Sequence, residues 1–269
     1  MAGPPATSLG LTTPQPTAAE LAGLLGPSHY RRTVPQLEQA RYVGDWWCYA
    51  FLPGAPLGLM FQHPGSTVLA RYTPEPGGFR VDNYEWLDDG SLRHAKAHAT
   101  PDLRYNEPGK FVVSFMPLAR GTYWVLELGP ATTPAPRPPP TKEAAAPTTT
   151  PGAETERSEA AGAAGAAGPL LYDWSVVGSE HDAYLWILVR QPTTPLPYDA
   201  IVKRLEQQHG YSDIARRLFV DHPNPAVVAA IAAGIPPQRA WPAGRDPRHV
   251  EVEQNLEAWH DFQRLLKGQ

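Results

Sequence analysis

The chain has 269 residues, of which 42% are hydrophobic and 19% charged, and this length allows one or two domains with an apolar core. Its formal net charge of −4 argues against nucleic acid or an anionic membrane surface as the main partner. The single cysteine, Cys48, excludes an intramolecular disulfide framework and is typical of a reducing compartment. Proline accounts for 32 residues, more than twice its usual share of roughly 5%, so part of the chain must lie outside strands and helices.

The N-terminal segment shows no export pattern. Residues 1–30 contain neither lysine nor arginine and no continuous apolar segment, so we expect no secretory signal peptide. No apolar run in the chain approaches the roughly 18 residues that a membrane-spanning helix needs. We therefore expect a cytoplasmic protein, with an organelle such as a plastid as the open alternative, and a mostly irregular extension over residues 1–35.

A compositional change divides the rest of the chain. Residues 130–169 consist mainly of Pro, Ala, Thr and Gly and contain no Leu, Ile, Val or aromatic residue. Because such a segment has almost nothing to bury, it cannot offset the entropy lost on ordering. We predict that it is a disordered insertion within one domain spanning residues 36–221.

The two blocks that flank this insertion show the pattern of short strands separated by turn residues. The predicted strands are 46–52, 67–73, 79–87, 91–100, 110–116, 122–128, 170–177 and 184–190. Because several connections are short enough for hairpins, the simplest topology is an up-and-down meander. We therefore predict an all-β fold, an eight-stranded antiparallel β-barrel that closes on itself and so removes its exposed edges.

The periodicity changes to a helical one after the eighth strand. Residues 198–209 place Ile201, Val202 and Leu205 on one stripe and are followed by Gly210, which predicts an amphipathic helix docked on the outside of the barrel. A last strand is expected at 215–220. The C-terminal extension, residues 222–269, ends in a second apolar stripe over 250–267, which predicts a helix that docks on the domain or, alternatively, contacts a partner or a membrane surface.

Three motifs occur in a fixed order along the predicted strands. Gly44-Asp45-Trp46 opens the first strand, Tyr172-Asp173-Trp174 lies in the seventh, and Arg190 ends the eighth. Together they resemble the lipocalins, and most closely the branch of bacterial lipocalin, apolipoprotein D and the plant temperature-induced lipocalins. The resemblance covers residues 36–221 without the insertion, and it implies that Arg190 packs over the ring of Trp46.

Side-chain alternation then predicts which residues face the interior, because successive side chains of a strand point to opposite faces. If Trp46 and Arg190 meet at one end, every second residue from them points inward. Leu185, Ile187 and Val189 then face outward, where the stripe of the predicted helix 198–209 can cover them. The predicted ligand-binding set is Cys48, Ala50, Val81, Asn83, Phe111, Val113, Phe115, Tyr184, Trp186 and Leu188.

The apolar interior and the resemblance predict a protein that carries or scavenges a small hydrophobic molecule, such as a fatty acid, a lysophospholipid or an isoprenoid. No enzymatic activity, cofactor or metal is expected. Two alternatives remain open. Cys48, which stands where the related branch often has glutamate, could act as a nucleophile. A haem-binding barrel could instead use histidines such as His94 and His98, which share one face of a strand.

Overall fold

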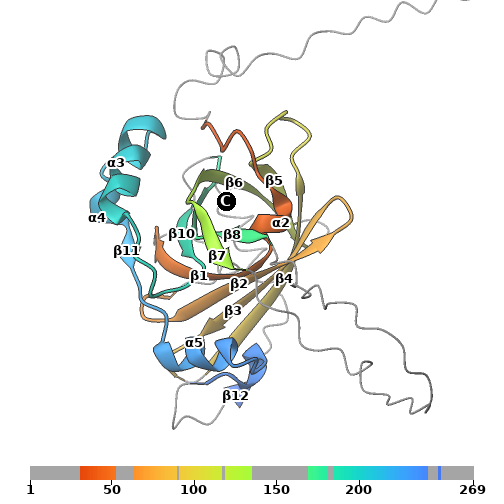
Figure 1. The fold of residues 1–269 in the computed structure, drawn as a ribbon, viewed down its shortest axis with the longest axis vertical. Coiled ribbons are helices and arrows are strands. Elements are labelled where there is room, and N and C mark those ends of the chain that lie inside the picture. Colours follow the sequence, from red (N-terminus) through yellow and green to blue (C-terminus); the bar gives the residue numbers. More distant parts are fainter. Residues whose placement is uncertain are drawn as a thin grey trace, which may run out of the picture.

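The computed structural model describes residues 31–52, 63–89, 91–116, 119–134, 169–180, 184–241 and 248–249. Eight antiparallel strands form a closed ring in the order β10-β9-β6-β5-β4-β3-β2-β1, and β10 pairs with β1 to close it (Figure 1). The strands are β1 (Gly44–Phe51), β2 (Thr67–Glu75), β3 (Gly78–Trp86), β4 (Ser91–Pro101), β5 (Lys110–Met116), β6 (Ala119–Leu128), β9 (Trp174–Gly178) and β10 (Leu185–Val189). The predicted eight-stranded barrel is confirmed.

Two hydrophobic clusters lie on opposite faces of this sheet. The inner cluster fills the barrel and contains Trp46, Tyr72, Phe79 and Phe111 among its members. The outer cluster lies between the barrel and the C-terminal helices. Alternate residues of β1 and β10 belong to different clusters, so these two strands bury both of their faces, whereas β4 exposes Lys96 and His98 on its outer face.

Helix α3 (Tyr198–Gln208) covers part of the outer face, where Ile201 and Leu205 are fully buried in one cluster with Leu185, Ile187 and Val189. The predicted docking of this helix is confirmed. In Figure 1, α3 and the short helix α4 (Ile214–Arg217) lie along one side of the ring, and α5 (Pro225–Ala232) lies along another. No helix in the described ranges is long and apolar enough to cross a membrane.

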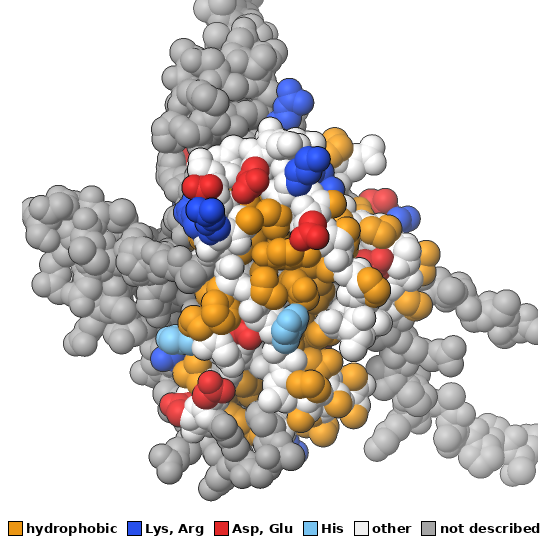
Figure 2. Space-filling view, turned by 90° about the vertical axis from the view of Figure 1, so that its left-hand side faces the viewer, with side chains coloured by type: hydrophobic (Ala, Val, Ile, Leu, Met, Phe, Trp, Pro, Cys, Tyr) orange, Lys and Arg blue, Asp and Glu red, His pale blue; other side chains and the backbone are white. Residues whose placement is uncertain are grey.

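Figure 2 shows the side of the molecule that carries α3 and α4. A hydrophobic area occupies the middle of this face and is bordered by lysine, arginine and acidic side chains. The predicted strand 215–220 is wrong over most of its length: residues 214–217 form α4, and β11 comprises Phe219–Val220 alone. The outer cluster explains the difference, because the α4 turn buries Ile214 completely beside α3.

The remaining elements are short. Helix α2 (Gln39–Tyr42) precedes β1, the 3₁₀ helix η2 (Pro237–Arg239) follows α5, and β12 (Arg248–His249) pairs in parallel with β4. The N-terminal extension is irregular over 31–35, where the amide of Val34 donates to the carbonyl of Val125. Residues 1–30 and the predicted helix 250–267 lie outside the described residues.

The insertion begins later than predicted, because Ala131–Pro134 form strand β7, which pairs with β8 (Leu170–Tyr172). The carboxylate of Asp173 stabilises this hairpin: it accepts hydrogen bonds from the amides and the hydroxyls of both Thr132 and Thr133. Asp173 also separates β8 from β9, which the sequence predicted as one strand over 170–177. Residues 135–168, the rest of the predicted insertion, lie outside the described part of the chain.

Candidate functional site

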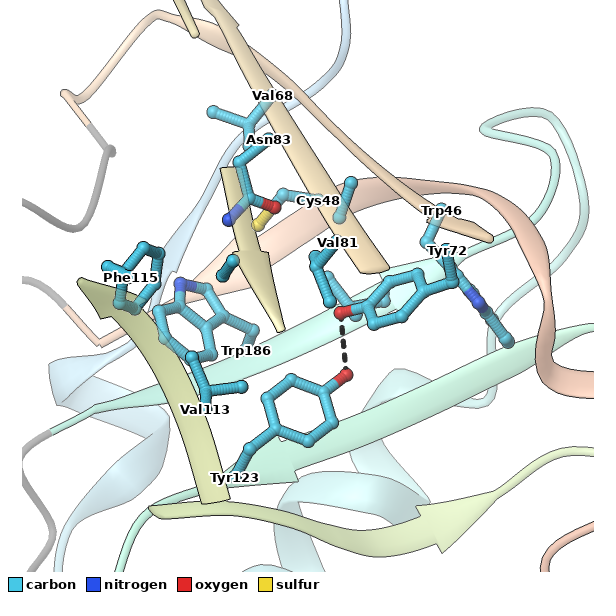
Figure 3. Close-up of a pocket in the computed structure, with 13 residues that line it drawn as sticks. Trp46, Cys48, Val68, Tyr72, Val81, Asn83, Val113, Phe115, Tyr123 and Trp186 are labelled. Carbon is cyan, nitrogen blue, oxygen red and sulfur yellow. Dashed lines mark hydrogen bonds between the residues drawn. The ribbon is translucent and has the colours of Figure 1, made fainter. Parts of the chain in front are cut away.

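A cavity inside the barrel is the candidate site (Figure 3). Its volume is about 60 Å³, counted as the space open to the centre of a water molecule. That is room for several waters or for one slender chain. The lining residues come from seven of the eight barrel strands, and they are Trp46, Cys48, Val68, Ala70, Tyr72, Val81, Asn83, Ala97, Val113, Phe115, Tyr123, Trp186 and Leu188. The lining is almost wholly apolar, and Asn83 supplies its one side-chain amide.

Strand alternation places these side chains. Val81 and Asn83 lie two residues apart on β3, and both reach the cavity. Tyr84, the residue after Asn83, points to the opposite face and belongs to the outer cluster. The ladder between β2 and β3 sets Ala70 opposite Asn83, and Tyr72 opposite Val81. The cavity is therefore a direct product of the strand register.

Seven of the ten predicted binding residues line this cavity: Cys48, Val81, Asn83, Val113, Phe115, Trp186 and Leu188. Ala50 does not, and its predicted inward orientation is wrong. The pairing of β1 with β10 shifts register between Cys48 and Ala50, which marks a β-bulge. Because the bulge adds one residue to β1, Ala50 lies in the outer cluster and Phe51 takes the inward place.

Phe111 and Tyr184 also lie outside the cavity lining, for different reasons. Phe111 is inside the barrel, but its ring packs against Phe79 at a centroid distance of 5.5 Å and belongs to the solid part of the core. The ring of Tyr184 lies 4.5 Å from that of Trp186, and its hydroxyl donates to the carbonyl of Thr122. Burial raises the pKa of this hydroxyl.

Sequence reasoning missed five lining residues: Val68, Ala70, Tyr72, Ala97 and Tyr123. A signal for one of them exists in β4, where Ala95, Ala97 and Ala99 alternate with Lys96 and His98. Small side chains at every second position leave room inside a barrel. For β2 and β6, no motif residue anchored the inward face.

The end of the barrel that carries Arg190 is closed by its side chain. The guanidinium lies 3.8 Å from the centre of the Trp46 ring. It donates to the main-chain carbonyls of Arg41, Tyr42, Asp45 and Tyr172 at 2.7–3.1 Å. Burial lowers the pKa of Arg190 to about 10. The packing that the resemblance implied is confirmed.

Gly44 owes its place in the Gly-x-Trp motif to this contact. Its φ of +97° belongs to the region that favours glycine, and a Cβ there would lie 3.2 Å from a terminal nitrogen of Arg190. Tyr172 supplies one of the carbonyls that accept from Arg190, while Trp174 packs in the outer cluster. The three motifs therefore meet at one end of the barrel.

A chain of four hydroxyl groups lies beside this end. Tyr123 hydrogen-bonds Tyr72 at 2.7 Å and Tyr42 at 2.8 Å, and Tyr42 continues to Ser175 at 3.1 Å. Figure 3 shows the Tyr72–Tyr123 bond at the cavity wall. Burial raises the pKa of all three tyrosines, and those of Tyr72 and Tyr123 lie well above the usual value. The tyrosine hydroxyls therefore stay neutral, and those of Tyr72 and Tyr123 are, with the amide of Asn83, among the polar groups of the residues that line the cavity.

Cys48, His94 and His98 are the residues on which the nucleophile and haem hypotheses depend. Cys48 is buried, its thiol donates weakly to the carbonyl of Ala50 at 3.5 Å, and the described residues that line the cavity include no histidine, lysine or carboxylate. His94 and His98 lie outside the lining. They interact with the carboxylates of Asp82 and Glu75 at 3.1 and 2.9 Å.

No family model and no curated protein matches this chain. Solved structures with the lipocalin fold resemble it. Insecticyanin from the tobacco hornworm Manduca sexta has 13% identity and a TM-score of 0.45, covering 74% of this chain and 87% of that one. Lobster apocrustacyanin A1 has 13% identity and a TM-score of 0.41 (70% and 80% covered). For H1 crustacyanin from the lobster Homarus americanus the values are 13% and 0.42 (78% and 86%). At this distance the likeness assigns neither a ligand nor a branch to this chain.

Proposed function

We propose that the barrel binds one slender hydrophobic molecule and carries or scavenges it. The supporting observation is the apolar cavity inside a closed barrel, whose tyrosine hydroxyls already have partners in one another. Since each methylene transferred from water to such a wall contributes about 0.8 kcal/mol, an acyl or isoprenoid chain can exceed the cost of association. A fatty acid, a lysophospholipid and an isoprenoid are the ligand classes that fit this chemistry.

Titration with parinaric acid and with the corresponding alcohol tests the proposal, because both are slim, linear and fluorescent. Trp46 and Trp186 line the cavity, so we expect tryptophan emission to fall as the probe emission rises, with saturation at one probe per chain. The proposal fails if neither signal changes with either probe up to tens of micromolar.

A cavity-filling variant provides the matched control. Ala97→Leu adds a side chain inside the barrel, whereas Ala229→Leu adds the same atoms at an exposed position on α5. We expect the first variant to weaken probe binding at least tenfold and the second to leave it unchanged. Equal affinities in the two variants would place the bound probe outside the cavity.

A further inference from the structure

Four polar residues form a group that we call the rim cluster: His63, Ser66, Glu85 and Arg93. Glu85 is at its centre, and its side chain is fully buried although it carries a carboxylate. His63 and Arg93 are 53% and 32% exposed, so the cluster lies between the solvent and the interior. A buried carboxylate is costly unless hydrogen bonds satisfy both of its oxygens.

The register places the rim cluster next to the cavity. Glu85 pairs with Val68 across β2 and β3, and Val68 lines the cavity. Along β3, Glu85 follows Asn83 by two residues and so has the same orientation, one step of roughly 7 Å farther from the Arg190 end. Arg93 stands opposite Glu85 on β4. Glu85 is therefore not part of the cavity lining but lies on the same face of the sheet, directly beyond Val68 and Asn83, which are.

The two oxygens of Glu85 have unequal surroundings. Oε1 accepts three hydrogen bonds: from the amide of His63 at 2.7 Å, from its Nδ1 at 2.9 Å and from the hydroxyl of Ser66 at 2.9 Å. Among the described residues Oε2 has no hydrogen-bond partner, and its nearest cation, Arg93, is 3.8 Å away. Within the described ranges this buried oxygen thus has an ionic neighbour but no hydrogen-bond donor.

The positive charge of the cluster is already engaged. A terminal nitrogen of Arg93 lies 3.3 Å from both ring nitrogens of His63 as well as near Glu85. A second carboxylate placed here would meet the negative charge of Glu85 at close range. A hydrogen-bond donor would instead find an ionised acceptor, and hydrogen bonds to ionised groups are the stronger ones.

We infer that the rim cluster is a head-group subsite for a hydrophobic molecule that ends in a hydroxyl or an ammonium group, with Glu85 Oε2 as the acceptor. This inference rests on the proposed function and narrows its ligand. An isoprenoid alcohol has the required donor and no negative charge. An ionised fatty acid has no such donor.

Competition against parinaryl alcohol tests the subsite, with 1-dodecanol, dodecylammonium, methyl dodecanoate and dodecanoate as four heads on one tail. We expect the alcohol and the ammonium to bind at least tenfold more tightly than the ester and the carboxylate. Equal affinities would overturn the subsite but leave the proposed function standing. If the probe itself does not bind, the proposed function fails as well, and the two failures are thereby distinguished.

Variants then test the role of Glu85. Glu85→Gln keeps the shape but turns an acceptor into an amide, so we expect the preference for donors to disappear. Glu75→Gln is the control, because it makes the same change on a carboxylate that pairs with His98. It should leave the preference for donors unchanged. Arg93→Gln removes the cation that the described part of the chain places nearest to Oε2, and it should preserve or increase ammonium binding. The inference is overturned if dodecanoate binds best and loses its affinity in Arg93→Gln. Should Glu85→Gln not fold, the ranking in the unchanged protein decides.

Discussion

The guanidinium of Arg190 and the indole of Trp46 face each other at 3.8 Å, and between them they close one end of the barrel. The same guanidinium donates to four main-chain carbonyls, those of Arg41, Tyr42, Asp45 and Tyr172. The Trp46 Nε1 donates to one of these carbonyls, that of Tyr42, at 2.8 Å. The pair thus joins α2, β1 and the hairpin that precedes β9.

We expect Arg190→Ala to lower the free energy of unfolding by about 3 kcal/mol or more, because it removes a cation–π contact and four hydrogen bonds to main-chain carbonyls. Thermal melting followed by circular dichroism measures this. Arg190→Lys retains the charge without the forked donors, so its melting temperature should lie between those of the unchanged protein and Arg190→Ala. Arg216→Ala, at an exposed position on α4, is the control. If Arg190→Ala has the same melting temperature as the control, Arg190 does not stabilise the closed end of the barrel as described.

The bulge in β1 predicts that Cys48 and Ala50, two residues apart, respond differently to enlargement: one change affects ligand binding and the other affects stability. Cys48→Leu enlarges a side chain of the cavity wall and should weaken probe binding while changing stability little. Ala50→Leu enlarges a fully buried side chain of the outer cluster and should cost about 1–3 kcal/mol through overpacking, with probe affinity unchanged. Denaturant unfolding and probe titration of both proteins measure this. If Ala50→Leu is the variant that loses affinity, the bulge is misplaced.

The three buried tyrosines predict a loss of stability at alkaline pH. Burial raises their pKa values in the folded state, so above pH 10 the unfolded chain releases protons that the folded chain retains. Stability is then unaffected below the unfolded pKa of roughly 10 and falls above it by about 1.4 kcal/mol per pH unit for each such tyrosine.

Tyr72→Phe tests this prediction, because it removes one titrating hydroxyl at the end of the hydrogen-bonded chain. Urea unfolding between pH 9 and pH 11 should show a slope that is smaller by one proton than in the unchanged protein. Tyr198→Phe, at a half-exposed position on α3, should reduce the slope much less. Identical slopes for Tyr72→Phe and the unchanged protein would show that this hydroxyl already ionises in the folded state.

Asp173 predicts an effect at the acidic end. Burial by itself raises the pKa of this carboxyl, but the hydrogen bonds from Thr132 and Thr133 outweigh it and hold the pKa below its usual value. The stabilisation is therefore complete above the unfolded pKa of roughly 4 and is lost as the pH falls through the lower, folded pKa. We expect Asp173→Asn to cost about 1–2 kcal/mol at neutral pH and to flatten the acid limb of the stability curve. Urea unfolding measures both, with the exposed Asp213→Asn as control; an unchanged acid limb would contradict the assignment.

Local patterns in the sequence were sufficient for the barrel. Each of the eight barrel strands was predicted to within a few residues of its observed bounds, apart from the break at Asp173, whereas most of the predicted strand 215–220 is the helix α4. Alternation with two anchors, Trp46 and Arg190, oriented β1 and β10 correctly up to the bulge. The outward set on β10 and the stripe on α3 were predicted as partners, because each needed an apolar cover that the other supplies.

What only the tertiary structure decided has one physical reason: it depends on contacts between residues far apart in the chain. The bulge before Ala50 arises from the pairing of β1 with β10, so no pattern within β1 predicts it. Tyr42, Tyr72, Tyr123 and Ser175 become one chain of hydroxyls when α2 and three strands converge. The two oxygens of Glu85 differ in their hydrogen bonds because His63 and Ser66, which lie just before β2, both donate to Oε1. The sequence by itself determined which residues alternate and what each face must bury, whereas the strand register decided which of them meet.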